Sequence, residues 1–306
     1  MDRLLTWYEY ALFLPFLSRL PLRLGYRLAA CRGKINWALD REWRSIALGR
    51  QYIRAATDRT IKNLLPDLSS AAIRRITRQR FEGFSREEFE AHLLMRERIR
   101  ELHFSVHGLE SVKEQLAQGR GIVMLTPHFD SFILGIVFLG MSGLIVNVMT
   151  SDVVENPLVD DSVRRFFFNK YRGMELYLQG GKAVHVEQDL RFFYQALRAG
   201  ECVIVLADLP AATAKDNRIW LRFLGRERSF LSGAYRLARR TGSALTGFVC
   251  RWEGAGNYTV NFYKCVPPGE VNETSYQEIY TFLDEAIRRN PERWWAADLL
   301  PAFETR

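Results

Sequence analysis

The residues best suited to chemistry stand just after two apolar runs. His128 closely follows the apolar run 122–125, and Asp130 comes two residues later. A neutral imidazole can take a proton from an attacking hydroxyl, and a nearby carboxylate can orient that imidazole. A plainer interpretation is that Asp130 caps the helix expected to begin near Ser131. We take His128 and Asp130 as the candidate catalytic pair, with His128 as the base.

A second acidic residue, Asp208, ends the apolar run 203–207. A carboxylate there could hold a basic partner or a substrate group, or it could simply belong to the turn before Pro210. In open α/β sheets, ligands bind beyond the carboxyl ends of the strands. We therefore expect Asp208 to face the same cleft as His128, and we count it as a substrate-binding candidate.

Four arginines are further substrate-binding candidates. Arg226 and Arg228 lie in a basic, glycine-containing segment, 223–230, which we expect to form a loop leading into a helix. Such a loop could receive a phosphate or a pantetheine phosphate, or it could be a solvated charged loop. Arg164 and Arg165 lie on an expected helix, where basic residues usually form a solvated face but can also contact anionic lipid.

The elements that must position these residues alternate between strand and helix from residue 103 onward. Hydrophobic periodicity predicts strands at 103–106, 122–125, 144–149, 174–178, 202–207, 244–251 and 258–263. Helices are expected between them, at 109–116, 131–139, 161–170, 188–197 and 233–241, and again at 275–289. The pattern predicts an α/β fold, with a mostly parallel sheet flanked by helices. We expect a helical N-terminal region at 1–100 and an α/β core at 101–306, together forming one continuous domain.

The charge and cysteine content narrow the possible partners. The 306-residue chain carries a formal net charge of +8, which suits an anionic partner such as a membrane surface or a phosphorylated substrate. Nucleic acid is not expected, because the arginines are dispersed and no nucleic-acid-binding module is recognisable. The four cysteines form no CxxC pair, so we expect no metal site and no disulfide framework. We also expect no cofactor. Isolated thiols fit a reducing, cytosol-facing location.

The N-terminal segment has the composition of a membrane-contacting helix. No apolar run reaches the roughly 18 residues that span a bilayer, and the best candidate, 7–17, is interrupted by Glu9 and Pro15. An amphipathic segment lying at the interface remains possible, and so does a first helix that simply packs on the domain. The apolar residues in question are Trp7, Tyr8, Tyr10, Phe13, Phe16, Leu17, Leu20 and Leu24. The accompanying basic residues are Arg19, Arg23 and Arg27.

Several short motifs, taken in order, resemble the bacterial lipid A biosynthesis acyltransferases of the lysophospholipid acyltransferase superfamily. The resemblance covers most of the chain and rests on the order and spacing of the motifs. They are LPLRLGYRL at 20–28, TPHF at 126–129, NPLVD at 156–160, ALRAG at 196–200, AD at 207–208, RFLG at 222–225, LARRTG at 237–242 and NPERWW at 290–295.

The resemblance implies a specific chemistry. In this family a histidine, matched here by His128, activates a hydroxyl on a glycolipid for attack on an acyl thioester. The family's acidic partner, five residues after the histidine, is replaced here by Ile133, and Asp130 is the nearest acid. Asp208 matches the family's aspartate at the end of the later strand. A family arginine falls near residues 167–169, so Arg164 or Arg165 would be its stand-in.

The expected function is acyl transfer at a membrane. The donor would be an acyl thioester of acyl carrier protein or of CoA, and the acceptor a hydroxyl of a lipid or glycolipid such as a lipid A precursor. The protein would lie peripherally on the cytoplasmic face of the cell inner membrane. The altered acid at Ile133 leaves two alternatives open: a related transferase that uses an aminoacyl or ornithine-type lipid, and a non-catalytic lipid-binding protein.

Overall fold

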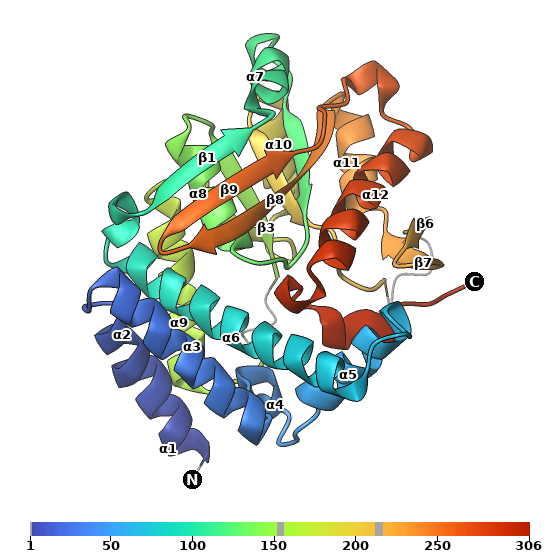
Figure 1. The fold of residues 1–306 in the computed structure, drawn as a ribbon. Helices are drawn as coiled ribbons and strands as arrows, with labels where there is room; N and C mark the ends of the chain where they lie inside the picture. The colour runs from blue at the N-terminus through green and yellow to red at the C-terminus, as the bar shows by residue number, and fades with distance from the viewer. Residues whose placement is uncertain (1, 152–155, 212–216) are drawn as a thin grey trace.

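A seven-stranded sheet forms the centre of the computed structural model, which describes residues 2–151, 156–211 and 217–306 (Figure 1). Its strand order is β1-β9-β8-β2-β5-β3-β4. All neighbouring strands run parallel except the antiparallel pair β8 and β9. The strands are β1 (His103–His107), β2 (Ile122–Thr126), β3 (Val146–Thr150), β4 (Ala183–His185), β5 (Cys202–Leu206), β8 (Ala244–Gly254) and β9 (Asn257–Phe262).

Both faces of this sheet are buried. All five residues of β2 are inaccessible to solvent, and they alternate between two hydrophobic clusters. Ile122 and Met124 belong to one cluster, whereas Val123 and Leu125 belong to the other. This explains why β2 is apolar throughout, as expected for a parallel strand covered on both sides.

Helices cover the two faces of the sheet. The core cluster on the first face includes α8 (Phe132–Met141) and residues of α7 (Leu109–Ala117) and α9 (Asp161–Glu175). The cluster on the second face includes residues of α10 (Leu190–Arg198), α11 (Gly233–Thr241) and α12 (Glu273–Arg289). The predicted α/β class, with a mostly parallel sheet flanked by helices, is confirmed.

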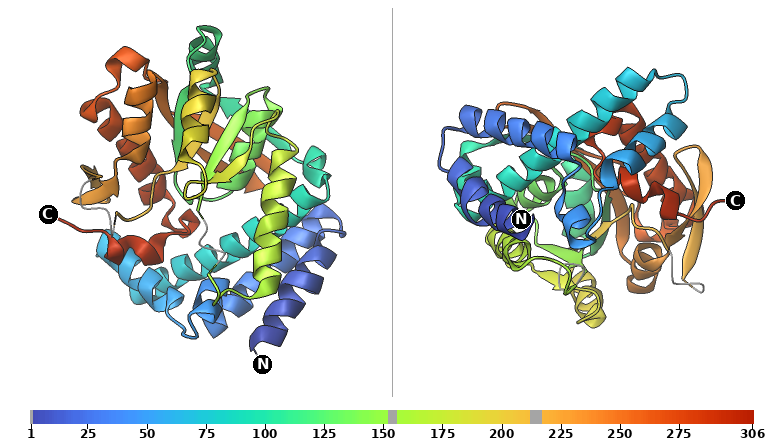
Figure 2. Two further views of the ribbon diagram at one scale, coloured as in Figure 1. Left: turned by 180° about the vertical axis from the view of Figure 1, so that it is seen from behind. Right: turned by 90° about the horizontal axis from the view of Figure 1, so that it is seen from below.

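The N-terminal region is helical, as expected, and lies across one end of the sheet (Figure 1). Figure 2 shows from behind how α9 extends from the sheet to these helices. Tyr10 and Phe89 share a hydrophobic cluster with Ile122 of β2, so this region and the sheet have a common core. The division at residue 100 stays a prediction. The elements are α1 (Asp2–Trp7), the π-helical η1 (Tyr8–Phe13), α2 (Leu14–Leu17), α3 (Leu22–Leu39), α4 (Trp43–Ala47), α5 (Ile53–Leu64), α6 (Ser70–Met95) and the 3₁₀ turn η2 (Arg98–Glu101).

Two local expectations were wrong. Residues 174–178 form no strand: α9 continues to Glu175, and the strand beside β3 is β4 instead. The apolar residues of that segment, Met174 and Leu178, are four positions apart and both buried in the first cluster, as in the end of a helix.

Within the described residues, no helix is both long and apolar enough to cross a membrane.

The expected loop at 223–230 is a β-hairpin of β6 (Arg218–Phe223) and β7 (Arg226–Leu231). Its two turn residues, Leu224 and Gly225, have φ values of 50° and 84°. Positive φ at both central positions is the geometry of the tight turns that join twisted antiparallel strands. The described residues that follow β9 also include the 3₁₀ turns η4 (Pro268–Glu270), η5 (Pro291–Arg293) and η6 (Ala297–Ala302).

Candidate active site

Strand register brings His128 and Asp208 together. In the parallel pair of β2 and β5, Thr126 lies opposite Leu206. His128 and Asp208 each follow these partners by two residues, so they leave the sheet at the same level. His128 Nδ1 lies 2.8 Å from Asp208 Oδ1, and the His128 backbone N–H donates to Asp208 Oδ2 at 2.9 Å. The Asp208 carboxylate thus holds His128 through both the imidazole ring and the backbone N–H.

The state of this carboxylate fixes the role of the imidazole. Burial alone would raise the pKa of Asp208. The contacts with His128 and the Trp294 indole outweigh burial and hold this pKa below its usual value. An ionised carboxylate only accepts hydrogen bonds, so Nδ1 carries the proton that joins the two side chains. The other ring nitrogen, Nε2, then has a free lone pair. The imidazole, whose side chain is 26% exposed, can therefore act as a base.

The segment Arg293–Trp295 holds both halves of this site. The Trp294 indole N–H donates to Asp208 Oδ2 at 2.7 Å. The Trp295 backbone N–H donates to the His128 carbonyl at 2.8 Å. Its indole N–H donates to the Asp130 carbonyl at 2.7 Å, and the Asp130 N–H donates to the Arg293 carbonyl, also at 2.7 Å. Six residues from three separate parts of the chain are thus tied together.

Asp130 is not the partner of the imidazole in this structure. Its side chain is fully buried, and its carboxylate forms ion pairs with Arg86 and with Arg293, the latter at 2.7 Å. It also accepts the Trp252 backbone N–H at 3.0 Å. The positive φ of Asp130, 50°, belongs to the tight turn between β2 and α8. The expected orienting contact therefore comes from Asp208, and Asp130 instead fixes the turn that carries His128.

A cavity of about 420 Å³ opens beside the imidazole. His128 and Phe132 line it together, with their rings edge to face at 5.2 Å. Ile133, which stands where the resemblance would place an acid, is one of the apolar lining residues. The remaining apolar wall comes from α4, α6, α8, β3, α9, the end of β5 and the C-terminal segment. Its residues are Trp43, Phe84, Ile136, Val148, Met149, Phe166, Phe167, Tyr171, Met174, Leu206, Leu209, Trp295, Ala296 and Leu299. A long hydrocarbon chain is the kind of ligand that such a wall favours.

Charged side chains are also part of the lining, but they are paired. Lys170 and Glu87 form a buried ion pair at 3.4 Å, and the Lys170 ammonium lies 4.4 Å from the centre of the Phe167 ring. Glu88 is bonded to Tyr10 and, at 2.5 Å, to Arg32. Pairing offsets the large free-energy cost of burying these charges. Lys170 is the cation that α9 contributes to the cavity lining.

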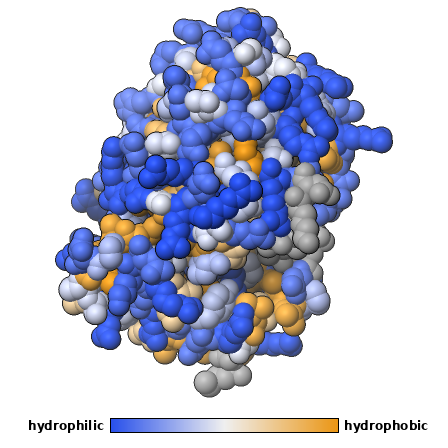
Figure 3. Space-filling view, turned by 90° about the vertical axis from the view of Figure 1, so that its right-hand side faces the viewer, coloured by the Kyte–Doolittle hydropathy of each residue, from blue (hydrophilic) through white to orange (hydrophobic). Residues whose placement is uncertain are grey.

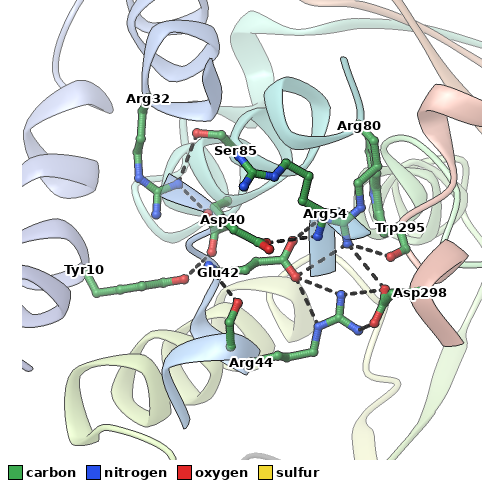
Figure 4. Close-up of polar contacts among 12 residues, drawn as sticks. Tyr10, Arg32, Asp40, Glu42, Arg44, Arg54, Arg80, Ser85, Trp295 and Asp298 are labelled. Atoms are coloured by element: carbon green, nitrogen blue, oxygen red, sulfur yellow. Dashed lines mark hydrogen bonds and ion pairs between the residues drawn. The ribbon is translucent and has the colours of Figure 1, made fainter. Parts of the chain in front are cut away.

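A buried ionic network includes Arg44, which also lines the cavity (Figure 4). Glu42 pairs with Arg80 and, at 2.8 Å, with Arg44, which also reaches Asp298 at 2.9 Å. Arg80 donates to the Trp295 carbonyl at 2.7 Å. The network thus joins α4 and α6 to the segment that holds His128 and Asp208. Removing one member would leave a buried charge unpaired.

The four arginines predicted to bind substrate lie elsewhere. Arg226 is exposed on the β6–β7 hairpin, and Arg228 is buried, with its Nε donating to the Phe223 carbonyl at 3.0 Å. Arg165 is exposed, and Arg164 donates to the Val159 carbonyl at 2.9 Å, before the start of α9. None of them is among the described residues that line the cavity. Their role in substrate binding stays a prediction without a contact to the site.

Two residues of the site were missed from the sequence. Lys170 falls four residues after Phe166, on the apolar face of α9, and this spacing was a usable signal. Trp294 belongs to the NPERWW motif at 290–295, but the motif does not reveal its partner, because the contact with Asp208 spans 86 positions. Across the described residues, no group of three or more His, Cys, Asp or Glu side chains is placed to hold a metal ion.

Two comparisons with known proteins give matches that cover most of the chain. Residues 46–297 match the family described as bacterial lipid A biosynthesis acyltransferase. The chain is also similar to the lipid A biosynthesis lauroyltransferase of Escherichia coli K12, with 25% identity over 308 aligned positions. The alignment covers 99% of this chain and 92% of the relative. The match includes β2, β5 and the Arg293–Trp295 segment, which together build the pair of His128 and Asp208. The chain therefore belongs to the bacterial lipid A biosynthesis acyltransferase family and is an acyltransferase.

Proposed function

We propose that the protein transfers a fatty acyl chain from an acyl thioester to a hydroxyl of a lipid A precursor or a related glycolipid, with His128 as the general base and Asp208 as its orienting acid. The observation that carries this proposal is the 2.8 Å contact between His128 Nδ1 and Asp208 Oδ1 at the mouth of an apolar cavity. The same contact supports catalysis despite Ile133, because the orienting carboxylate comes from β5 rather than from α8.

The proposed reaction needs no reactant beyond the two substrates, because His128 takes up one proton and gives it back. His128 Nε2 takes the proton of the acceptor hydroxyl as its oxygen attacks the thioester carbonyl carbon. A C–O bond forms and the C–S bond breaks, and the leaving sulfur receives the proton from the imidazolium. Asp208 keeps its negative charge throughout and stabilises the imidazolium that forms between the two transfers.

The cavity beside His128 is the proposed site of the acyl chain. Its wall is predominantly apolar, and its charged side chains are already paired within the protein. A chain that fills this cavity would place the thioester carbonyl near the imidazole at its mouth. Ile133 and Ile136 on α8 would then contact the hydrocarbon directly.

The N-terminal helices are the proposed membrane-contacting surface. The side of the molecule seen in Figure 3, which carries β6 and β7, is mostly hydrophilic with small separate hydrophobic areas. By contrast, large apolar side chains are exposed close together in sequence over residues 4–24: Leu4, Leu5, Trp7, Tyr8, Leu12, Phe16 and Leu24. Arg19, Arg23 and Arg27 are also exposed there. Tyr10 and Leu17, which were expected to contribute, are buried instead. This surface supports peripheral binding to the cytoplasmic face of the inner membrane.

Purified protein tests the reaction. Labelled acyl chains are offered as a thioester of acyl carrier protein or of CoA, together with a lipid A precursor in mixed micelles. We expect transfer with one or both donors, and a loss of roughly 10³-fold or more in kcat for His128→Ala. His103→Ala, which removes an exposed histidine from β1, is the matched control and should keep full activity. Undiminished transfer by His128→Ala would refute the role of His128.

Vesicles test the membrane surface. We expect the protein to co-sediment with vesicles of anionic phosphatidylglycerol more strongly than with neutral phosphatidylcholine. Replacing Arg19, Arg23 and Arg27 together by glutamine should abolish this preference. The same triple change on the opposite part of the molecule, at exposed Arg222, Arg226 and Arg289, should leave it intact. Equal loss from both triple variants would show that net charge, rather than this surface, drives binding.

A further inference from the structure

A second cavity lies on the other face of the sheet, across a shared wall from the first. Its volume is about 410 Å³. Its lining includes Leu125 and Val205, whose side chains pack on the second cluster, and Leu237 of α11. The two cavities have five lining residues in common at the carboxyl ends of β3 and β5: Met149, Thr150, Ser151, Leu206 and Leu209. The strand ends therefore separate two adjacent apolar spaces.

The second cavity differs from the first in its charge. Arg236 and Arg240 of α11 both line it, and Arg236 donates to the Asn217 side chain, which lines it as well. No carboxylate occurs among its described lining residues. Arg240 is exposed, so its guanidinium stands where the cavity meets solvent. An anionic group is the natural complement of this rim.

From this combination, we propose that the second cavity binds a hydrocarbon chain whose anionic group lies against Arg236 and Arg240, and that this chain belongs to the acceptor lipid. The inference rests on the proposed function. The cavity does not include His128, so a chain inside it is not the one whose carbonyl reacts. The acceptor lipid therefore extends over the carboxyl ends of β3 and β5, from the second cavity to the His128 imidazole in the first cavity.

The lining distinguishes the acceptor from the donor. A phosphopantetheine arm also carries a phosphate, but its two amides require hydrogen-bond partners wherever they are buried. Most of the wall here is aliphatic or aromatic, and the hydroxyl of its Tyr280 is already bonded to the Ala207 carbonyl at 2.8 Å. A fatty chain makes no such demand. The second cavity thus favours the hydrocarbon of the acceptor over the donor arm.

Dodecyl phosphate is the probe that tests this site. Isothermal titration below its micelle concentration should show two sites per chain in the wild type. Ile136→Trp fills the first cavity and should leave one site. In that background, Arg236→Gln combined with Arg240→Gln should weaken the remaining site at least fivefold at low salt. Arg239→Gln, an exposed change on the same helix outside the lining, is the matched control and should have no effect.

Three results would overturn the proposal. They are a single site in the wild type, an affinity unchanged by the paired arginine substitutions, or displacement of the probe from the Ile136→Trp protein by 4′-phosphopantetheine. If Ile136→Trp fails to fold, the paired arginine substitutions alone still decide the question, because they should weaken one of two sites selectively. The titration contains no thioester, so it stands or falls separately from acyl transfer itself.

Discussion

Replacing Asp208 by asparagine should remove the base without disturbing the fold. Asp208 Oδ2 accepts two N–H donors, from the His128 backbone and the Trp294 indole, whereas Oδ1 faces only Nδ1. An asparagine keeps its two donor contacts only by placing its oxygen at the Oδ2 position. Its NH₂ group then faces Nδ1, which must become an acceptor. The ring proton moves to Nε2, where the lone pair for the hydroxyl proton is needed.

The size of this effect follows from losing the productive tautomer. We expect kcat for Asp208→Asn to fall on the order of 10³- to 10⁴-fold, equivalent to about 4–5.5 kcal/mol of activation free energy. The KM for both substrates should change little, because neither cavity loses a wall. The midpoint of thermal unfolding should stay within a few degrees of that of the wild type. Steady-state kinetics with acyl thioester and lipid acceptor, beside a calorimetric scan, measure both quantities.

Asp130→Asn is the matched comparison, since the same chemical change is made two residues from the histidine. Its carboxylate neutralises Arg86 and Arg293, so the loss of charge should cost roughly 3 kcal/mol or more of stability. The folded fraction should nevertheless keep a kcat within about tenfold of the wild type, because the contact of His128 with Asp208 is intact. The reverse outcome, with Asp130→Asn inactive and Asp208→Asn active, would refute the reasoning.

Three further substitutions test Trp294, which contacts Asp208, and two buried titratable residues of α6, Glu90 and His92. Trp294→Phe removes one hydrogen-bond donor to Asp208, so kcat should fall about 10-fold or more while KM is unchanged. Because the Asp208 carboxylate becomes more basic without this donor, the acid limb of the pH–rate profile should move to higher pH. Burial raises the pKa of Glu90 to about 7 from 4.5, so its ionisation costs stability as pH rises through that window. Glu90→Gln should remove this slope of up to about 1.4 kcal/mol per pH unit, as followed by urea unfolding. Burial lowers the pKa of His92 to about 3 from 6.5, so stability is lost as pH falls below 6.5; in His92→Phe the same unfolding series should show no such loss. If the free energy of unfolding of Glu90→Gln or of His92→Phe depends on pH in the same way as that of the wild type, the pH dependence assigned to that residue is wrong.

The fold was predictable because its signals are local. Runs of apolar residues marked the buried strands, and 233–241 was predicted with the bounds of α11. Segment 174–178 failed because short apolar runs occur in both helices and strands, and tertiary packing decides between them. The hairpin at 223–230 failed because Leu224-Gly225 was taken as part of a loop, although glycine beside a residue of positive φ also marks a tight hairpin turn.

The place of the site was predictable, but the pairing of its side chains was not: His128 and Asp208 were expected to face one cleft, whereas Asp130 was expected to orient the imidazole. His128 was identified from its place after a strand, but strand order is a property of the whole sheet. The neighbouring position of β2 and β5 decides that Asp208 meets the imidazole, and nothing at residues 122–130 reveals it. Closeness in sequence favoured Asp130, yet its turn directs the carboxylate toward arginines of α6 and η5.

The Arg293–Trp295 segment gives the assembly of this enzyme an order in time. A chain emerging from the ribosome at roughly 5–20 residues per second presents the histidine long before the tryptophan that steadies its acidic partner. Until residue 294 has emerged and folded back, Asp208 lacks its indole donor and the turn at residues 128–130 lacks its clamp. The hydrogen bonds that hold His128 and Asp208 in place are therefore completed only after residues 293–295 have been synthesised.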